Sequence, residues 1–135
     1  MTEQNNATKQ TILIIDDNKD FLEIFSMKLE SAGFRVATAN SGTIGIEQAQ
    51  KLKPDLVLLD VEMPVMNGIE VLAKLKTDPN TASLKVVFLT NYGEPQKEAS
   101  WVDEKFAREA GAMDYIKKSE DLSEVVIEVK RLLKT

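Results

Sequence analysis

Apolar residues lie along the chain in short, nearly unbroken runs that alternate with stretches where they recur at helical spacing. Short runs rich in Val, Ile and Leu are typical of strands. We predict five strands, at residues 11–16, 34–39, 55–60, 84–90 and 113–118. The first, third and fourth runs are apolar almost throughout, which indicates burial on both faces of a sheet, whereas the second and fifth are more polar and belong at the sheet edges.

Five stretches of helical spacing separate or follow these strands. In the first, Phe21, Phe25 and Leu29 form an apolar stripe that we expect to face the core, as does a second stripe within residues 122–133. The remaining helices are predicted at residues 41–52, 68–76 and 96–110. The alternation predicts an α/β fold of the flavodoxin-like type, a doubly wound five-stranded parallel sheet of order 2-1-3-4-5 with five helices on its two faces.

The domain organisation follows from the same pattern. Residues 1–10 are polar and carry no apolar period, so we expect a flexible N-terminal tail followed by one domain over residues 11–135. With 22 acidic and 17 basic residues the net charge is -5, which disfavours binding to nucleic acid or to an anionic membrane. No apolar run approaches the roughly 20 residues that span a bilayer, and the N-terminus lacks a secretory signal, so we expect a cytoplasmic protein.

Cysteine and histidine are both absent from the chain. Their absence removes disulfides, thiolate chemistry and the commonest general base and metal ligand, so carboxylates, hydroxyls and lysines must supply any chemistry. Four such residues stand at the ends of the three central strands: Asp16, Asp17, Asp60 and Thr90. Because the carboxyl ends of parallel strands meet at one edge of the sheet, we expect these side chains to converge.

A single Asp in a strand-to-helix loop is usually a helix cap or turn former, and each of the three acids has that structural interpretation. Three gathered carboxylates are harder to explain in this way, because two of them about 4 Å apart repel by roughly 4 kcal/mol at an effective dielectric of 20. A divalent cation is the simplest compensation, and all-oxygen ligation favours Mg²⁺, with Mn²⁺ as the alternative. Lys118, at the end of the fifth strand, is either an ordinary solvated edge lysine or the positive group that a phosphoryl acceptor needs.

Four segments together resemble the receiver domains of two-component response regulators, in particular stand-alone receivers of the chemotaxis-regulator type. They are IIDDN at 14–18, LLDVEMPVMNG at 58–68, FLT at 88–90 and GAMDYIKK at 111–118, and the resemblance covers about residues 11–134. It implies a phosphorylation-dependent signalling switch in a phosphorelay rather than an enzyme. The phosphoryl donor would be a partner histidine kinase or histidine phosphotransfer protein.

The resemblance also implies roles for individual residues. Asp60 would attack phosphorus and become an aspartyl phosphate. Asp17 would ligate Mg²⁺ directly, Asp16 directly or through water, and the backbone carbonyl of Glu62 would be a further ligand beside Asp60. These roles suit phosphoryl transfer, in which positioning and charge neutralisation supply most of the catalysis.

Three further residues would complete the switch. Thr90 and Lys118 would each contact a phosphoryl oxygen. Tyr115 would be the switch aromatic, as its position three residues before Lys118 favours, with an ordinary edge-strand aromatic as the alternative. A downstream protein would dock on the face formed by the fourth helix, the fifth strand and the fifth helix. The resemblance further implies a monomer or a weak dimer that depends on phosphorylation.

Several positions depart from the family pattern. Asn91 follows Thr90 where a small residue is usual, and Ser119 follows Lys118 where the family has proline with a cis bond; without proline we expect a trans bond or a rearranged loop. The connection from Thr90 to Lys118 is also longer than usual, and Trp101 within it either closes the rim of the core or marks a partner-binding surface.

Other functions stay open at this stage. A degenerate receiver would act only as a protein-binding module, which Asn91 and Ser119 favour. A metal-dependent phosphatase or phosphotransferase would use the same aspartyl nucleophile, with Glu62 imperfectly placed as its general acid. A flavin-binding module of similar topology is a weaker alternative, because no hydroxyl-rich phosphate loop follows the first strand.

Overall fold

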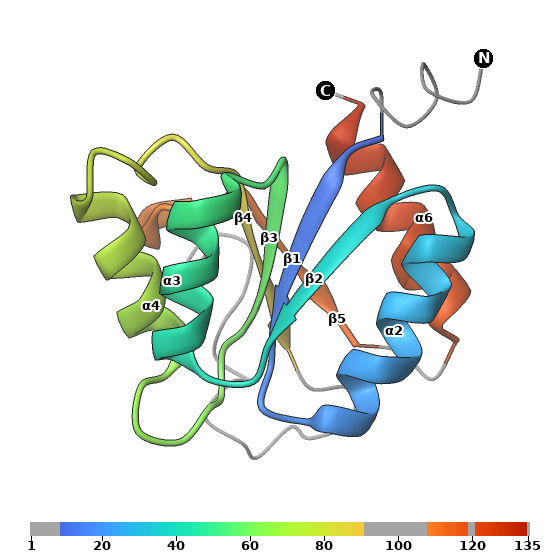
Figure 1. Cartoon of the computed structure of the whole chain (residues 1–135), viewed down its shortest axis with the longest axis horizontal. Coiled ribbons are helices and arrows are strands. Elements are labelled where there is room, and N and C mark those ends of the chain that lie inside the picture. The colour runs from blue at the N-terminus through green and yellow to red at the C-terminus, as the bar shows by residue number, and fades with distance from the viewer. Residues whose placement is uncertain (1–8, 91–107, 119–120, 135) are drawn as a thin grey trace.

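The computed structural model of the chain describes residues 9–90, 108–118 and 121–134. At its centre is a five-stranded parallel sheet of order β2-β1-β3-β4-β5, which confirms the predicted order and places the two more polar strands at the edges (Figure 1). The strands are β1 Thr11–Ile15, β2 Arg35–Ala39, β3 Leu56–Asp60, β4 Val86–Thr90 and β5 Asp114–Lys117.

The helices of the described residues follow the predicted alternation. They are α2 Lys19–Ser31, α3 Gly42–Leu52, α4 Gly68–Thr77 and α6 Leu122–Leu133. None of them is long and apolar enough to cross a bilayer. The helix predicted at 96–110 is described only at residues 108–110, which are helical, and the predictions for residues 1–8, Asn91, Trp101 and Ser119 lie outside the described residues.

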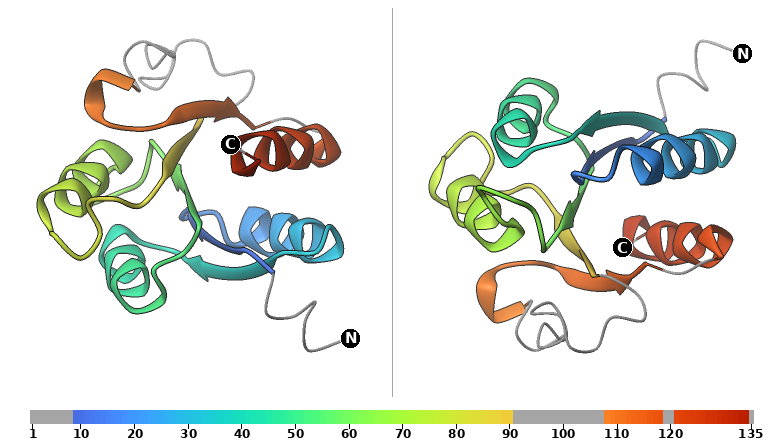
Figure 2. Two further views of the ribbon diagram at one scale, coloured as in Figure 1. Left: turned by 90° about the horizontal axis from the view of Figure 1, so that it is seen from above. Right: turned by 90° about the horizontal axis from the view of Figure 1, so that it is seen from below.

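Helices cover both faces of the sheet, with α3 and α4 on one side and α2 and α6 on the other (Figures 1 and 2). Successive side chains of a strand point to opposite faces. Leu13 and Ile15 of β1 accordingly belong to the core cluster under α3 and α4, whereas Ile12 and Ile14 belong to the cluster under α2 and α6. This arrangement explains why the central strands are almost continuously apolar until their carboxyl ends.

The apolar stripe of α2 differs slightly from the prediction. Leu22, Phe25 and Leu29 are buried, whereas Phe21 is only partly buried. The cause is helix geometry, since positions 22, 25 and 29 lie on one face at i, i+3 and i+7, and Phe21 lies at the margin of that face. The Phe21 ring stays in contact with the core through Phe25, with 5.2 Å between the ring centroids.

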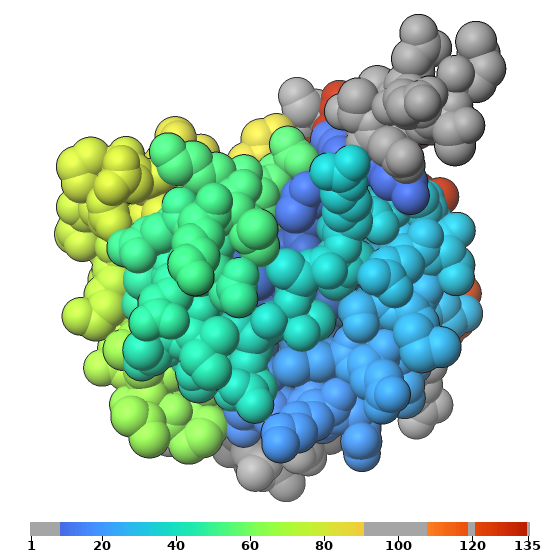
Figure 3. Space-filling model, viewed as in Figure 1, coloured from blue at the N-terminus to red at the C-terminus, as the bar shows by residue number. Residues whose placement is uncertain are grey.

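Helix α3 packs closely against its neighbours through small residues. A Cβ atom at Gly45 would lie 2.5 Å from the side chain of Ile15, and one at Gly42 would lie 2.8 Å from that of Val71. The helix is therefore held close to both β1 and α4. On the surface, α3 and α2 flank the edge of the sheet formed by β2 (Figure 3).

Candidate functional site

Three carboxylates meet at the carboxyl edge of the sheet. Asp16 and Asp17 follow β1 directly, and Asp60 is the last residue of β3, the hydrogen-bonded neighbour of β1. One carboxylate oxygen from each lies within 4.8 Å of the other two. Asp16 and Asp60 are buried, with exposed fractions of 0% and 3%, whereas Asp17 is exposed. The structure thus brings the three acids together in a cluster that is open to solvent on one side.

Asp16 is held by the N-cap residue of α2 and by Lys118. Its Oδ1 accepts a hydrogen bond from the backbone N–H of Asn18 at 2.9 Å. Its Oδ2 lies 2.6 Å from Nζ of Lys118, yet this buried oxygen accepts no hydrogen bond of acceptable geometry from the described residues. A buried carboxylate oxygen with unused lone pairs, beside two further carboxylates, suits a hard divalent cation such as Mg²⁺. The residues present therefore fit the predicted metal.

Burial dominates the electrostatics of Asp60. Burial is the largest cause that raises the pKa of this carboxyl, followed by the nearby charge of Asp16 and, less strongly, that of Asp17, and the net result of all influences is a rise from 3.8 to about 7. The ammonium of Lys118 and the backbone N–H of Glu62, which donates to Oδ1 at 3.3 Å, act in the opposite direction. Without a metal, Asp60 is therefore about half protonated near pH 7. A cation in the cluster would favour the carboxylate, which is the nucleophilic form.

Lys118 reaches the acid cluster from the end of β5. Its backbone N–H donates to the carbonyl of Thr90 at 2.8 Å, which ties the residue to the end of β4. Its side chain is 15% exposed, and its Nζ lies 4.4 Å from the centre of the Phe21 ring. Sequence reasoning placed Lys118 near the site but missed Phe21. The available signal was an aromatic residue in the first helical turn after the acidic pair.

Thr90 and Tyr115 lie on one face of the sheet. Asp60 pairs with Leu89 in the parallel register, so buried Thr90 stands one residue beyond that pair. Tyr115 pairs with Phe88, two residues before Thr90, and packs partly buried against the core cluster under α3 and α4. Because alternate residues share a face, Thr90 and Tyr115 project to the same side. This placement suits a coupled movement of the two side chains.

The loop from β3 to α4 forms the wall beside Asp60. Asn67 has φ -80° and caps α4 in a capping box with Glu70. Val65 has a positive φ, at 69°. Gly68 is needed for a steric reason, since a Cβ atom there would collide with the carbonyl oxygen of Asp60. The helix can start this close to Asp60 because position 68 lacks a side chain.

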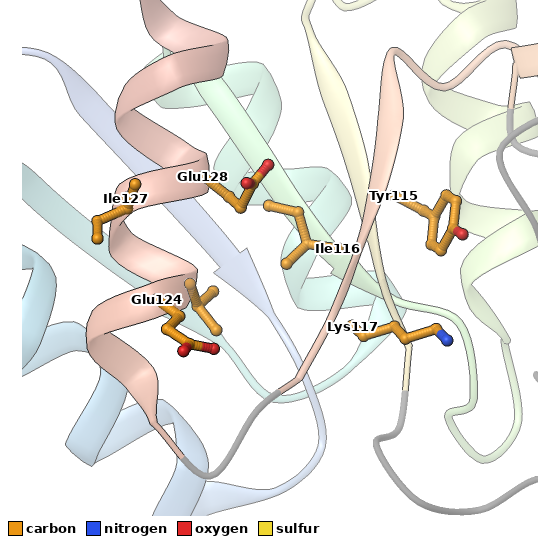
Figure 4. Close-up of a pocket in the computed structure, with 7 residues that line it drawn as sticks. Tyr115, Ile116, Lys117, Glu124, Ile127 and Glu128 are labelled. Carbon is orange, nitrogen blue, oxygen red and sulfur yellow. The ribbon is translucent and has the colours of Figure 1, made fainter.

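A groove lies between β5 and α6. Figure 4 shows Ile116 pointing from β5 toward α6, whereas Tyr115 points to the opposite side of the strand. Glu124, Ile127 and Glu128 of α6 also line the groove. It therefore combines apolar side chains with acidic ones, next to the residue predicted to be the switch aromatic.

Comparison with known proteins identifies relatives of the whole domain. A family described as "Response regulator receiver domain" matches residues 12–130. The "DNA-binding dual master transcriptional regulator RpaA" of Synechocystis sp. is 37% identical over 123 residues, which are 91% of this chain and 48% of that protein. A Vibrio cholerae protein named "Probable cyclic di-GMP phosphodiesterase" is 39% identical over 106 residues, 78% of this chain and 22% of that protein. This chain thus spans about half or less of these relatives.

A solved structure shares the same architecture. The N-terminal domain of a response regulator receiver protein from Methanoculleus marisnigri JR1 superimposes with a TM-score of 0.71 at 34% identity. The match covers 93% of this chain and 98% of that one. The likeness therefore extends over the whole sheet and its helices rather than over one motif.

Proposed function

Because the chain belongs to the response regulator receiver domain family, which acts in phosphorylation-dependent two-component signalling, we propose that Asp60 accepts a phosphoryl group from a phosphohistidine of a partner protein. The partner is a histidine kinase or a histidine phosphotransfer protein. These 135 residues contain no histidine, so the donor residue lies outside them.

The proposed reaction moves one phosphoryl group. A carboxylate oxygen of Asp60 attacks phosphorus as the bond from phosphorus to the donor imidazole nitrogen breaks, and the bonding electron pair stays with that nitrogen. When bound, Mg²⁺ neutralises charge on the phosphoryl oxygens and on the carboxylates. Asp16, Asp17 and Asp60 would hold it by their side chains, and Glu62 by its backbone carbonyl. Thr90 would donate its hydroxyl to a phosphoryl oxygen, and Lys118 would pair with another.

One observation carries the proposal. Three carboxylate oxygens lie within 4.8 Å of one another at a single sheet edge, and two of the three residues are buried there. Such an arrangement costs stability by mutual repulsion and by loss of hydration, as the raised pKa of Asp60 records. A structural role as caps or turn formers would not require the three side chains to face one another.

The output of the proposed switch is a change at the surface of β5. Movement of Thr90 toward a phosphoryl group would leave room for the Tyr115 ring on the same face of the sheet. The ring lies on the side of β5 away from α6, so its movement would alter the surface of β5 on that side. We propose this surface, together with the neighbouring groove between β5 and α6, as part of the docking surface for a downstream protein. The phosphoryl group ends on the protein itself, so the domain is a switch rather than a multiple-turnover enzyme.

Intact-mass measurement after incubation with acetyl phosphate and Mg²⁺ tests the function. The wild-type chain should gain the mass of one phosphoryl group, and Asp60→Ala should not. Asp55→Asn is a matched control, because Asp55 is exposed and immediately precedes the opposite end of β3, so this variant should be modified like wild type. An adduct that persists in Asp60→Ala would contradict the assignment. Repeated turnover of a phosphate ester would instead support the phosphatase.

A further inference from the structure

We propose that Phe21 is a positioning residue for Lys118, its ring holding the lysine ammonium toward the acid cluster. The inference rests on the function proposed above and adds a residue to it. The Nζ atom of Lys118 lies 4.4 Å from the centre of the Phe21 ring and 2.6 Å from Oδ2 of Asp16. The ammonium is thus placed between an aromatic face and a buried carboxylate.

A closed series of contacts fixes the ring in this place. The backbone N–H of Asn18 donates to Oδ1 of Asp16 at 2.9 Å, and the side chain of Asn18 accepts the backbone N–H of Phe21 at 3.0 Å. The Phe21 ring faces the ammonium of Lys118, and this ammonium pairs with Oδ2 of Asp16, which completes the series. The helix cap therefore sets the position of the Phe21 backbone relative to a proposed metal ligand.

The Phe21 ring also packs against a second aromatic ring, that of Phe25. Phe25, one helical turn later, is completely buried, and its ring centroid lies 5.2 Å from that of Phe21. The tilted pair anchors a partly exposed ring to the core cluster under α2 and α6. Phe21 consequently has little freedom to turn away from Lys118.

The aromatic face does what an aliphatic side chain of similar size would not. A ring attracts a cation through its quadrupole, and this attraction is larger where water is partly excluded, as it is around the 15% exposed side chain of Lys118. This attraction directs the ammonium inward, although the lysine side chain has four rotatable bonds and lies at the end of an edge strand.

Nuclear magnetic resonance of the metal-free chain tests the contact without any phosphoryl transfer. The ring current of Phe21 should shift the terminal methylene resonance of Lys118 upfield in the wild type. Phe21→Leu should return it to the position of an ordinary lysine, and Phe21→Tyr, which keeps the ring, should retain the shift. An unshifted Lys118 in the wild type would overturn the proposal.

Phosphorylation kinetics test the consequence. With acetyl phosphate and Mg²⁺, Phe21→Leu should be modified about 3- to 10-fold more slowly than wild type, and Phe21→Tyr at nearly the wild-type rate. Ile24→Ala is the control, because Ile24 is an exposed residue of the same helix, and its rate should not change. In a Lys118→Met background, Phe21→Leu should cause no further slowing if the ring acts through the ammonium.

The two proposals fail in different ways. A wild-type chain that takes up no phosphoryl group overturns the function itself. If the wild type is phosphorylated and Phe21→Leu is phosphorylated at the same rate, only the role of Phe21 is overturned. The same holds if Phe21→Leu slows phosphorylation equally in the presence and in the absence of Lys118.

Discussion

Replacing Asp60 by Asn should stabilise the metal-free protein at neutral and alkaline pH. The substitution keeps nearly the same side-chain shape and removes a charge that lies in a buried position beside two other acids. In the wild type, burial and the neighbouring carboxylates raise the pKa of Asp60 from 3.8 to about 7. The folded state therefore prefers the neutral form of this side chain, which the variant provides at every pH.

The sign and size of the effect follow from proton linkage. Between about pH 4 and pH 7 the folded wild type retains a proton on Asp60 that the unfolded chain has lost, so its stability falls as the pH rises through this range. At roughly 1.4 kcal/mol for each pKa unit, the whole difference from 3.8 to about 7 corresponds to about 4 kcal/mol. The part that lies between about pH 5 and pH 8 is about 2 to 3 kcal/mol.

Urea denaturation with a metal chelator measures this difference. The stability of Asp60→Asn relative to wild type should increase by about 2 to 3 kcal/mol from about pH 5 to pH 8. Glu47→Gln removes one negative charge from an exposed position on α3, and its relative stability should stay flat over the same range. Adding Mg²⁺ at the higher pH should reduce the difference in unfolding free energy between Asp60→Asn and wild type, because the cation stabilises the wild type more. A difference in unfolding free energy between the two proteins that is constant with pH, or that shrinks as the pH rises, would refute the reasoning.

Three other substitutions test single features of the site. Val65→Asn should raise the free energy of unfolding by about 1 kcal/mol in urea denaturation, because Val65 is fully exposed and has φ 69°, which asparagine tolerates better than a β-branched residue. Gly68→Ala should lower it by about 3 kcal/mol, because its Cβ collides with the carbonyl of Asp60, and should weaken Mg²⁺ binding in calorimetry. Asn18→Ala should lower the free energy of unfolding by about 1 kcal/mol, because the helix cap is lost. It should also reduce the ring-current shift of Lys118. Equal shifts in Asn18→Ala and the wild type would show that the cap does not set the position of Phe21.

The fold was predictable because it depends on patterns that span many residues. Buried parallel strands read as apolar runs, and strands of one sheet joined by helices admit few arrangements, so the sheet order and the meeting of Asp16 with Asp60 follow from the positions of these runs. Even the edge strands could be identified, because β2 and β5 carry polar residues on a less buried surface.

The details that escaped prediction depend on single side chains and single torsion angles. The buried stripe of α2 contains Leu22 rather than Phe21. The two alternatives differ by a rotation of the helix by one position, and the apolar pattern is compatible with both. The positive φ of Val65 arises because a turn closes by the hydrogen bond from Met66 N–H to the carbonyl of Pro64 at 2.7 Å, and valine gives no local signal for it. The contact of Phe21 with Lys118 joins residues 97 positions apart through the packing of α2 on the sheet.

Each of the three gathered acids is relieved of repulsion in a different way when no metal is bound. Asp16 lies against the ammonium of Lys118, Asp17 is exposed to water, and Asp60 is half protonated near pH 7 because of its raised pKa. A divalent cation in the cluster would make two of these arrangements unnecessary at once. Asp60 would then lose its proton and become the nucleophilic carboxylate, and the ammonium of Lys118 would no longer be required by Asp16. It would stay close to the site against the Phe21 ring, where it could meet the negative charge of an incoming phosphoryl group.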